Sequence, residues 1–154
     1  MVDIAAFPTI RNVLCEGKNF GNFIAAGTIK AGMVVSFNTT GVSFSVQGSK
    51  KGTSGQPVGV ALNDAVIGGR LTVAMDGCIV NVANADDTTG IDAGDVLEDN
   101  DNAILGTVST VDLMDAGVIL VMKYQVGIAL DDIAGNGYGR MLVSCGRFSS
   151  ANNA

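Results

Sequence analysis

Three short motifs occur twice in this chain in the same order, and such a duplication limits the possible folds more than composition does. The pairs are residues 29–34 with 91–96, residues 58–64 with 126–132, and the apolar segments that begin at Arg70 and at Arg140. The members of the three pairs are 62, 68 and 70 residues apart. We therefore predict two copies of one supersecondary unit, near residues 28–77 and 90–146.

Glycine occupies a fixed place in both copies. Gly32 and Gly94 follow an alanine at the start of a predicted strand, where a turn favours a positive φ angle. The apolar segments that contain Gly59 and Gly127 resemble buried strands, and a central glycine there indicates a bulge or a second backbone close by. The polar pairs that follow, such as Asp131-Asp132, are predicted to end these strands in turns.

The chain is rich in glycine, with 21 residues, and contains only 2 prolines, so short strands joined by tight turns are favoured over long helices. The further predicted strands are residues 34–37, 43–46, 70–75, 78–82, 103–108 and 118–122. Short helical turns are expected at residues 63–67 and 110–116. The prediction is an all-β, barrel-like fold in which the two related units close one barrel.

The predicted division of the chain places one β domain at residues 28–148. Residues 1–27 are expected to form an extended N-terminal arm outside the duplication. Residues 149–154 are polar and small and are expected to form a flexible tail. Residues 107–123 are an insertion that only the second copy has.

The sequence contains no histidine, which removes the commonest general base and the commonest zinc ligand. The acidic stretch 86–101 is the best remaining candidate for a site, but the spacing after Asp99 fails a calcium loop because Ile104 and Thr110 occupy key positions. Residues 135–139 fit a hairpin turn better than a nucleotide loop, since a strand is predicted after them. We predict no enzyme activity, no metal and no cofactor.

Three widely spaced cysteines, Cys15, Cys78 and Cys145, are interpreted as free thiols in a reducing compartment. The net charge of −6 makes nucleic acid a poor partner. The charge is uneven, because residues 1–51 sum to +3, and this asymmetry could orient the molecule on a partner. The Lys50-Lys51 loop is interpreted as a solvated turn. No secretory signal or membrane-spanning segment is predicted.

The order of these landmarks resembles a family of small phage capsid decoration (cement) proteins. The matching segments are Ala31-Gly32, residues 58–64, 70–77, 93–96 and 126–130. The resemblance covers about residues 25–146 and implies a β-barrel-like or β-tulip domain. It also implies a homotrimer on the outer surface of an icosahedral head, made in the host cytoplasm, that stabilises contacts between major capsid protein subunits. The long arm and the insertion in the second copy depart from the family pattern.

The resemblance also directs attention to the N-terminal arm as a capsid contact. The arm carries the apolar residues Phe7, Pro8 and Ile10 and the basic Arg11, which could act as anchors on the capsid. The expected partners are therefore the major capsid protein and further copies of the chain, with no nucleic acid and no membrane.

Two alternatives stay open at this point. The first is a carbohydrate-binding or adhesive virion module, such as a head fibre base or a tail component. The second is a β-clip or hammerhead accessory domain of an enzyme, because the Ile-x-Ala-Gly-x-Val turn also occurs in such modules. The few aromatic residues of this chain do not favour a carbohydrate platform.

Overall fold

The structure, a computed structural model, describes residues 15–38, 43–49, 55–84, 88–99, 107–110 and 120–151. All regular elements in these ranges are strands, which confirms the all-β prediction. They are β1 (Cys15–Glu16), β2 (Phe20–Ala25), β3 (Val34–Phe37), β4 (Ser45–Gly48), β5 (Pro57–Ala61), β6 (Arg70–Ala74), β7 (Ile79–Ala83), β8 (Val96–Asp99), β9 (Val108–Thr110), β10 (Leu120–Ala129) and β11 (Tyr138–Ala151).

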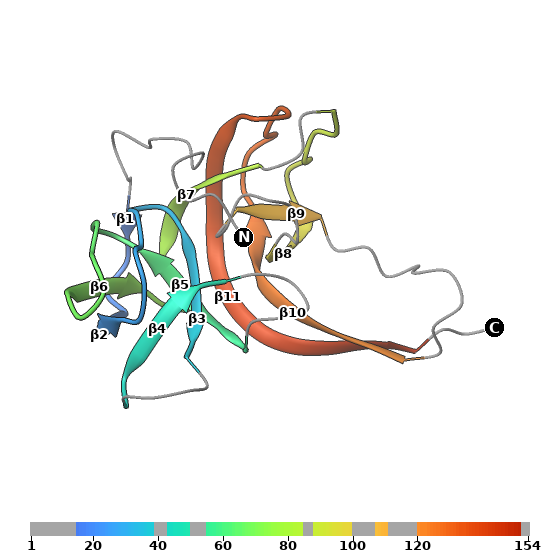
Figure 1. The fold of residues 1–154 in the computed structure, drawn as a ribbon. Helices are drawn as coiled ribbons and strands as arrows, with labels where there is room; N and C mark the ends of the chain where they lie inside the picture. Colours follow the sequence, from blue (N-terminus) through green and yellow to red (C-terminus); the bar gives the residue numbers. More distant parts are fainter. Residues whose placement is uncertain are drawn as a thin grey trace.

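The first unit, residues 20–74, closes into a barrel with the strand order β2-β4-β3-β5-β6. Its neighbouring strands are antiparallel except for β2 and β4, which run parallel. In Figure 1 this barrel occupies the left of the view, and the long hairpin of β10 and β11 curves away from it to the right.

The second unit, residues 79–151, repeats the same arrangement as a curled sheet. Its order β7-β11-β10-β8-β9, with β1 added beside β7, matches the order β2-β6-β5-β3-β4 of the first barrel. A single parallel bridge joins Asn84 to Val108, at the place where Ala25 pairs with Val46 in the first unit. The second unit therefore curls in the same direction as the first barrel, and this bridge lies where the first barrel closes.

The prediction that two units close one barrel is therefore wrong, because each unit curls on itself. Each copy begins one strand earlier than the repeated motifs, with β2 in one and β7 in the other. Residues 20–25 and 79–84 are identical at only one matching position, which is Asn22 in the first copy and Asn81 in the second. The repeats near 28–77 and 90–146 consequently lacked their first strand.

The predicted arm is corrected in its second half. Residues 15–27 contain β1 and β2, and Phe23 of β2 is buried inside the first barrel. The residues before Cys15 lie outside the described residues. At the other end, β11 continues to Ala151, three residues into the expected tail. The assignment of residues 28–148 to one domain stays a prediction.

The strand registers confirm the duplication and correct one of its three offsets. Val34 pairs with Val60 in the first unit as Val96 pairs with Ile128 in the second, which gives offsets of 62 and 68 residues. In both units the pairing shifts by one residue just beyond these pairs. Along β6 and β11 the offset stays 68, because Thr72 and Arg140 occupy equivalent positions.

The two-residue error at Arg140 has a simple cause. Side chains of a strand alternate between its faces with a period of two, so a shift of two residues leaves the pattern of apolar and polar positions unchanged. The repeated arginine therefore suggests that Arg70 and Arg140 are equivalent, although the position equivalent to Arg140 is Thr72.

The turn glycines behave as predicted. Gly32 and Gly94 have φ angles of 91° and 96°, and each amide donates a hydrogen bond to the carbonyl of an equivalent alanine at the end of β5 or β10. Gly59 and Gly127 mark a close backbone approach. A Cβ atom at either position would collide with the carbonyl oxygen of the adjacent strand, at Ala74 or Leu142.

Residues 63–67 form no helical turn, contrary to prediction. Ala65 instead forms an antiparallel bridge with Ile29, as Ile133 does with Ile91. The polar pairs lie in turns as expected. Asp64 and Asp132, however, form hydrogen bonds with the turns that contain Ala31 and Ala93 and not within their own turns. Each carboxylate accepts a hydrogen bond from the amide of Ala31 or Ala93, at 2.8 and 2.9 Å. These bridges hold the segment extended. Residues 111–116 of the second expected turn lie outside the described residues.

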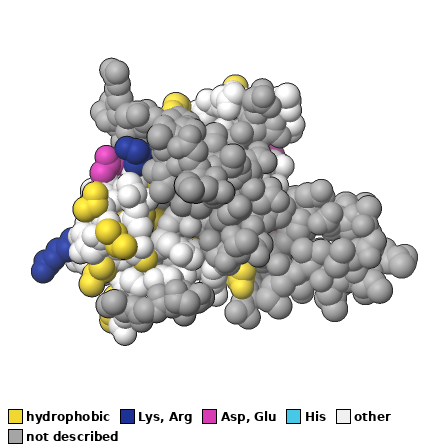
Figure 2. Space-filling model, in the orientation of Figure 1, with side chains coloured by type: hydrophobic (Ala, Val, Ile, Leu, Met, Phe, Trp, Pro, Cys, Tyr) yellow, Lys and Arg dark blue, Asp and Glu magenta, His cyan; other side chains and the backbone are white. Residues whose placement is uncertain are grey.

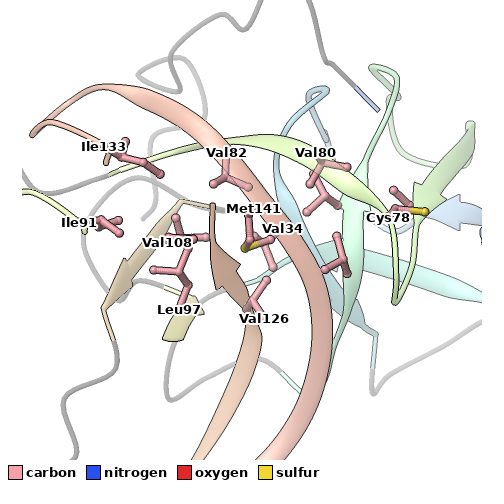
Figure 3. Packing of buried hydrophobic residues seen from close by; sticks show 14 residues of the cluster. Val34, Cys78, Val80, Val82, Ile91, Leu97, Val108, Val126, Ile133 and Met141 are labelled. Atoms are coloured by element: carbon pink, nitrogen blue, oxygen red, sulfur yellow. The ribbon is translucent and has the colours of Figure 1, made fainter. Parts of the chain in front are cut away.

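The described core consists of two clusters that do not follow the boundary between the units. One cluster fills the first barrel and includes Phe23, Met33 and Leu71. The other fills the second unit but also contains Val34, Val60 and Ala74 of the first. Figure 3 shows Val34 among side chains of the second unit. The first unit is therefore packed against the second by buried apolar side chains.

Candidate interaction surface

The four residues predicted to contact a capsid, Phe7, Pro8, Ile10 and Arg11, lie outside the described residues. So does the Lys50-Lys51 loop. In the described ranges, no group of three or more Cys, Asp or Glu side chains is placed to hold a metal ion. The same ranges contain no helix that is long and apolar enough to cross a membrane.

The described part of the acidic stretch 86–101 serves the fold. Asp95 accepts a hydrogen bond from the Asp92 amide at 3.0 Å, which closes the turn before β8. Glu98 and Asp99 are buried on β8, and Asp99 accepts a hydrogen bond from the Ser49 hydroxyl. The residues Asn100–Gly106, which would continue a calcium loop, lie outside the described residues.

Asp131 forms an ion pair with Arg140 on the surface of the second unit. Its carboxylate accepts two side-chain hydrogen bonds from the guanidinium, at 2.7 and 2.9 Å, and one from the Arg140 amide at 3.0 Å. These bonds lower the pKa of Asp131 to about 2. In the first unit Asn63 accepts the equivalent bond, from the Thr72 amide at 2.8 Å. Asp131 is therefore a turn residue, as predicted.

All three cysteines are free, in agreement with the prediction. Burial and the neighbouring Asp76 raise the pKa of Cys145 to about 12. Burial and the neighbouring Cys78 also raise the pKa of Cys15. A thiol with a raised pKa carries little thiolate at neutral pH and is a weak nucleophile. Cys15 and Cys145 are therefore poor candidates for catalysis.

Five of the nine large apolar side chains that are exposed among the described residues form an apolar patch at one end of the first barrel. We define this apolar patch as Ile24, Phe37, Phe44, Val66 and Ile67. Phe44 and Ile67 are the most exposed, at 72% and 74%. Figure 2 shows hydrophobic side chains gathered on the left of the molecule, over the first barrel.

Three structural features bring the patch residues together around the end of β2. The rings of Phe37 and Phe44 lie 6.3 and 6.4 Å from the ring of Phe23, which is buried beneath them. The amide of Ile24 donates a hydrogen bond to the Phe44 carbonyl at 2.9 Å. The amide of Gly68, which follows Val66 and Ile67 in the β5–β6 turn, donates to Ala25 at 2.8 Å.

The second unit shows that the fold does not require this patch. At four equivalent positions the second unit has smaller or charged residues, and the fifth, Gly106, lies outside the described residues. The equivalents of Ile24, Phe37, Val66 and Ile67 are Ala83, Asp99, Ala134 and Gly135. Exposed apolar side chains that folding does not need are typical of an interaction site.

One comparison with known proteins, the search of solved structures, supports the fold. No family model matches the chain, and no curated protein matches it. Among solved structures, it is similar to the head fiber gp8.5 N base of bacteriophage phi29. The TM-score is 0.52 at 14% identity, over 86% of this chain and 95% of that chain. This likeness covers both units and establishes a shared fold.

The apolar patch was not predicted from the sequence. Its residues come from β2, β3, the turn before β4 and the β5–β6 turn, so no local pattern joins them. Val66 and Ile67 are the sequence feature from which the apolar patch could have been predicted. Two apolar residues at the tip of a predicted turn, where the second copy has Ala134 and Gly135, do not serve a core.

Proposed function

We propose that this chain is a structural protein of a bacteriophage head, which attaches to the outer capsid surface as a decoration protein. The observation that carries the proposal is the fold shared with a phage head fibre base over nearly the whole of both chains. The resemblance of the sequence motifs to capsid decoration proteins supports the same class of protein. The role requires a rigid fold and a docking surface and no catalytic group.

The apolar patch is the proposed docking surface. Phe37, Phe44 and Ile67 supply large apolar side chains, the kind of residue that contributes most of the binding energy at protein interfaces when it is buried by a partner. Arg70 pairs with Ile24 across β2 and β6 and adds a cation at the edge of the patch. The proposed partner is therefore a region of the major capsid protein with an apolar centre and an acidic edge.

The N-terminal residues Phe7, Pro8, Ile10 and Arg11 remain part of the proposal as a second capsid contact. Self-association, expected as a homotrimer, would multiply the number of patches that face one capsid. Several weak contacts on one rigid assembly bind more tightly than a single contact does.

The base of a head fibre is a second candidate function, favoured by the description of the phi29 protein. The two roles predict different behaviour. A decoration protein binds at many equivalent sites and increases the resistance of the head to heat. A fibre base attaches a fibre to the head, and we expect it to leave that resistance unchanged.

The direct test uses heads of the virus that encodes the chain, prepared without it. Purified protein is added, and bound protein is measured by co-sedimentation, followed by the temperature at which the heads disrupt. We expect saturable binding and a higher disruption temperature. Failure of the native chain to bind would overturn both roles, and binding with no thermal effect would favour the fibre base.

A matched pair of variants tests the patch itself. Val66→Asp places a carboxylate in the patch, whereas Ala134→Asp makes the same change at the equivalent exposed turn of the second unit. We expect Val66→Asp to weaken head binding by roughly tenfold or more, as for a central interface residue. Ala134→Asp should bind as the native chain does. Equal binding by the two variants would exclude the patch as the docking surface.

A further inference from the structure

The outer face of the first barrel carries an apolar row that the second unit covers. The row consists of Val34, Val60 and Ala74, which pair with one another across β3, β5 and β6. All three are 0% exposed and belong to the core cluster of the second unit. β5 lies against β10 and β11 there. The row thus forms the first unit's side of the contact between the units.

The second unit has the same row, and in the described structure it is only partly covered. Val96, Ile128 and Leu142 pair across β8, β10 and β11 as their equivalents do in the first unit. Val96 is 38% exposed, and Ile128 and Leu142 are half-buried. Leu130 lies beside them at 39% exposure. We call Val96, Ile128, Leu130 and Leu142 the second row.

The contact between the units explains why no other unit of the same chain covers the second row. The first unit contributes its outer row, while the second unit contributes a different surface, formed by β10 and β11. Such a contact is heterologous, because different surfaces of the two units meet. The first unit's equivalents of the β10 and β11 side chains, such as Val58 and Val73, are buried inside its own barrel, so among the described residues only the second unit's row is left without a partner in the chain. Within the chain, the structure that covers such a row is the other β unit.

Charge identifies which part of a second copy fits the second row. Residues 15–75 carry five basic and two acidic residues, whereas residues 78–151 carry three basic and eleven acidic residues. The first unit is therefore net +3 and the second net −8. Two second units would repel each other, and a first unit of another copy is the electrostatic complement. Asp131 and Arg140 lie next to Leu130 and supply a polar edge.

We propose that the second row binds the first unit of a second copy of this chain, which gives a head-to-tail assembly. A head-to-tail contact closes into a ring when its rotation divides a full turn. This inference deepens the self-association proposed above and rests on it, but it does not depend on capsid binding.

The test measures molecular mass by sedimentation equilibrium across a range of protein and salt concentrations. We expect the native chain to associate, and the association to weaken as salt is added, because the two surfaces carry opposite charge. Val96→Lys and Leu130→Lys place a cation in the second row, facing a basic unit. Each should weaken association by roughly tenfold or more. Both positions are exposed enough for a lysine to reach solvent without unfolding the strand.

Two further variants make the outcome decisive. Tyr138→Ser removes an exposed side chain near the second row with no added charge, and it should weaken association less than the lysine variants do. Val66→Asp, in the apolar patch, should leave the mass unchanged while it reduces head binding. A native chain that stays monomeric at every concentration overturns the proposal. So does association that strengthens with salt, or that survives both lysine substitutions in folded protein.

Discussion

Gly59 and Gly127 show at the scale of single residues why the duplicated strands kept their glycines. Each faces a carbonyl oxygen of the next strand, so a methyl group at either position would force two backbones apart. Gly27 is a matched control, because its Cβ position meets no atom within 4 Å. The glycines of the buried strands are therefore required by packing.

We expect Gly59→Ala to lower the free energy of unfolding by about 3 kcal/mol, at the upper end of the usual cost of overpacking, because backbone must move. Gly27→Ala should change it by less than about 0.5 kcal/mol. Denaturant unfolding followed by circular dichroism measures both. Similar values for the two variants would mean that β5 and β6 separate without cost.

The ion pair of Asp131 with Arg140 predicts a dependence of stability on pH. The pKa of Asp131 is about 2 in the folded chain and about 3.9 in an unfolded one. A carboxyl group with a lowered pKa stabilises the fold above the unfolded value, and this contribution is lost as the pH falls from about 4 to about 2. The native chain should therefore lose stability across this window.

Asp131→Asn tests this contribution, and the first unit supplies the control for its geometry. Asn63 occupies the equivalent position and accepts the same backbone hydrogen bond, so asparagine fits the turn. We expect the variant to fold at neutral pH and to lose less stability than the native chain between pH 4 and pH 2. Thermal melts at a series of pH values measure the difference. Parallel pH profiles would contradict it.

At the scale of elements, the sequence predicted those strands that carry a repeated motif. β3, β5, β6, β8 and β10 lie close to the predicted segments, because a glycine turn or an apolar run marks each of them. The predicted strand at residues 78–82 corresponds to β7, but β2 was not predicted, and the two were not recognised as equivalent strands. Their inner positions hold Phe23 in one copy and Val82 in the other, and equivalent packing does not require similar residues.

The long β10–β11 hairpin was predicted only in part. A strand was expected at residues 118–122, where β10 begins, but its pairing with the end of β11 was not expected. The repeat accounts for β10 from Gln125 onward and for β11 up to about Val143, since those residues have equivalents in β5 and β6. The remaining length pairs Leu120 with Ala151 and has no equivalent in the first unit. Pairing of this kind depends on two segments that are distant in sequence, so no local sequence pattern predicts it.

The interaction surfaces were less predictable than the fold for a related reason. A docking surface is defined by what the fold leaves exposed, and exposure depends on how the strands curl. Val34 and Val96 occupy equivalent positions with the same residue, yet one is buried between the units and the other is open. Only the arrangement of the two units separates these roles.

At the scale of the whole molecule, the buried row of the first unit predicts that the two units unfold together. Val60 belongs to the first barrel but is packed in the core of the second unit. Both tyrosines, Tyr124 and Tyr138, lie in the second unit, so tyrosine fluorescence reports on that unit alone. Circular dichroism reports on both. The two signals should give one coincident transition for the native chain.

Val60→Thr makes this coupling measurable, because threonine keeps the shape of valine and places a hydroxyl in the contact between the units. We expect a loss of about 2 kcal/mol, the typical cost of a buried hydroxyl without a partner. The fluorescence midpoint should fall together with the dichroism midpoint, although the substitution lies in the unit without tyrosine. Ile128→Thr, at the half-exposed equivalent position, should cost less. A fluorescence midpoint that stays unchanged in Val60→Thr would mean that the two units unfold independently.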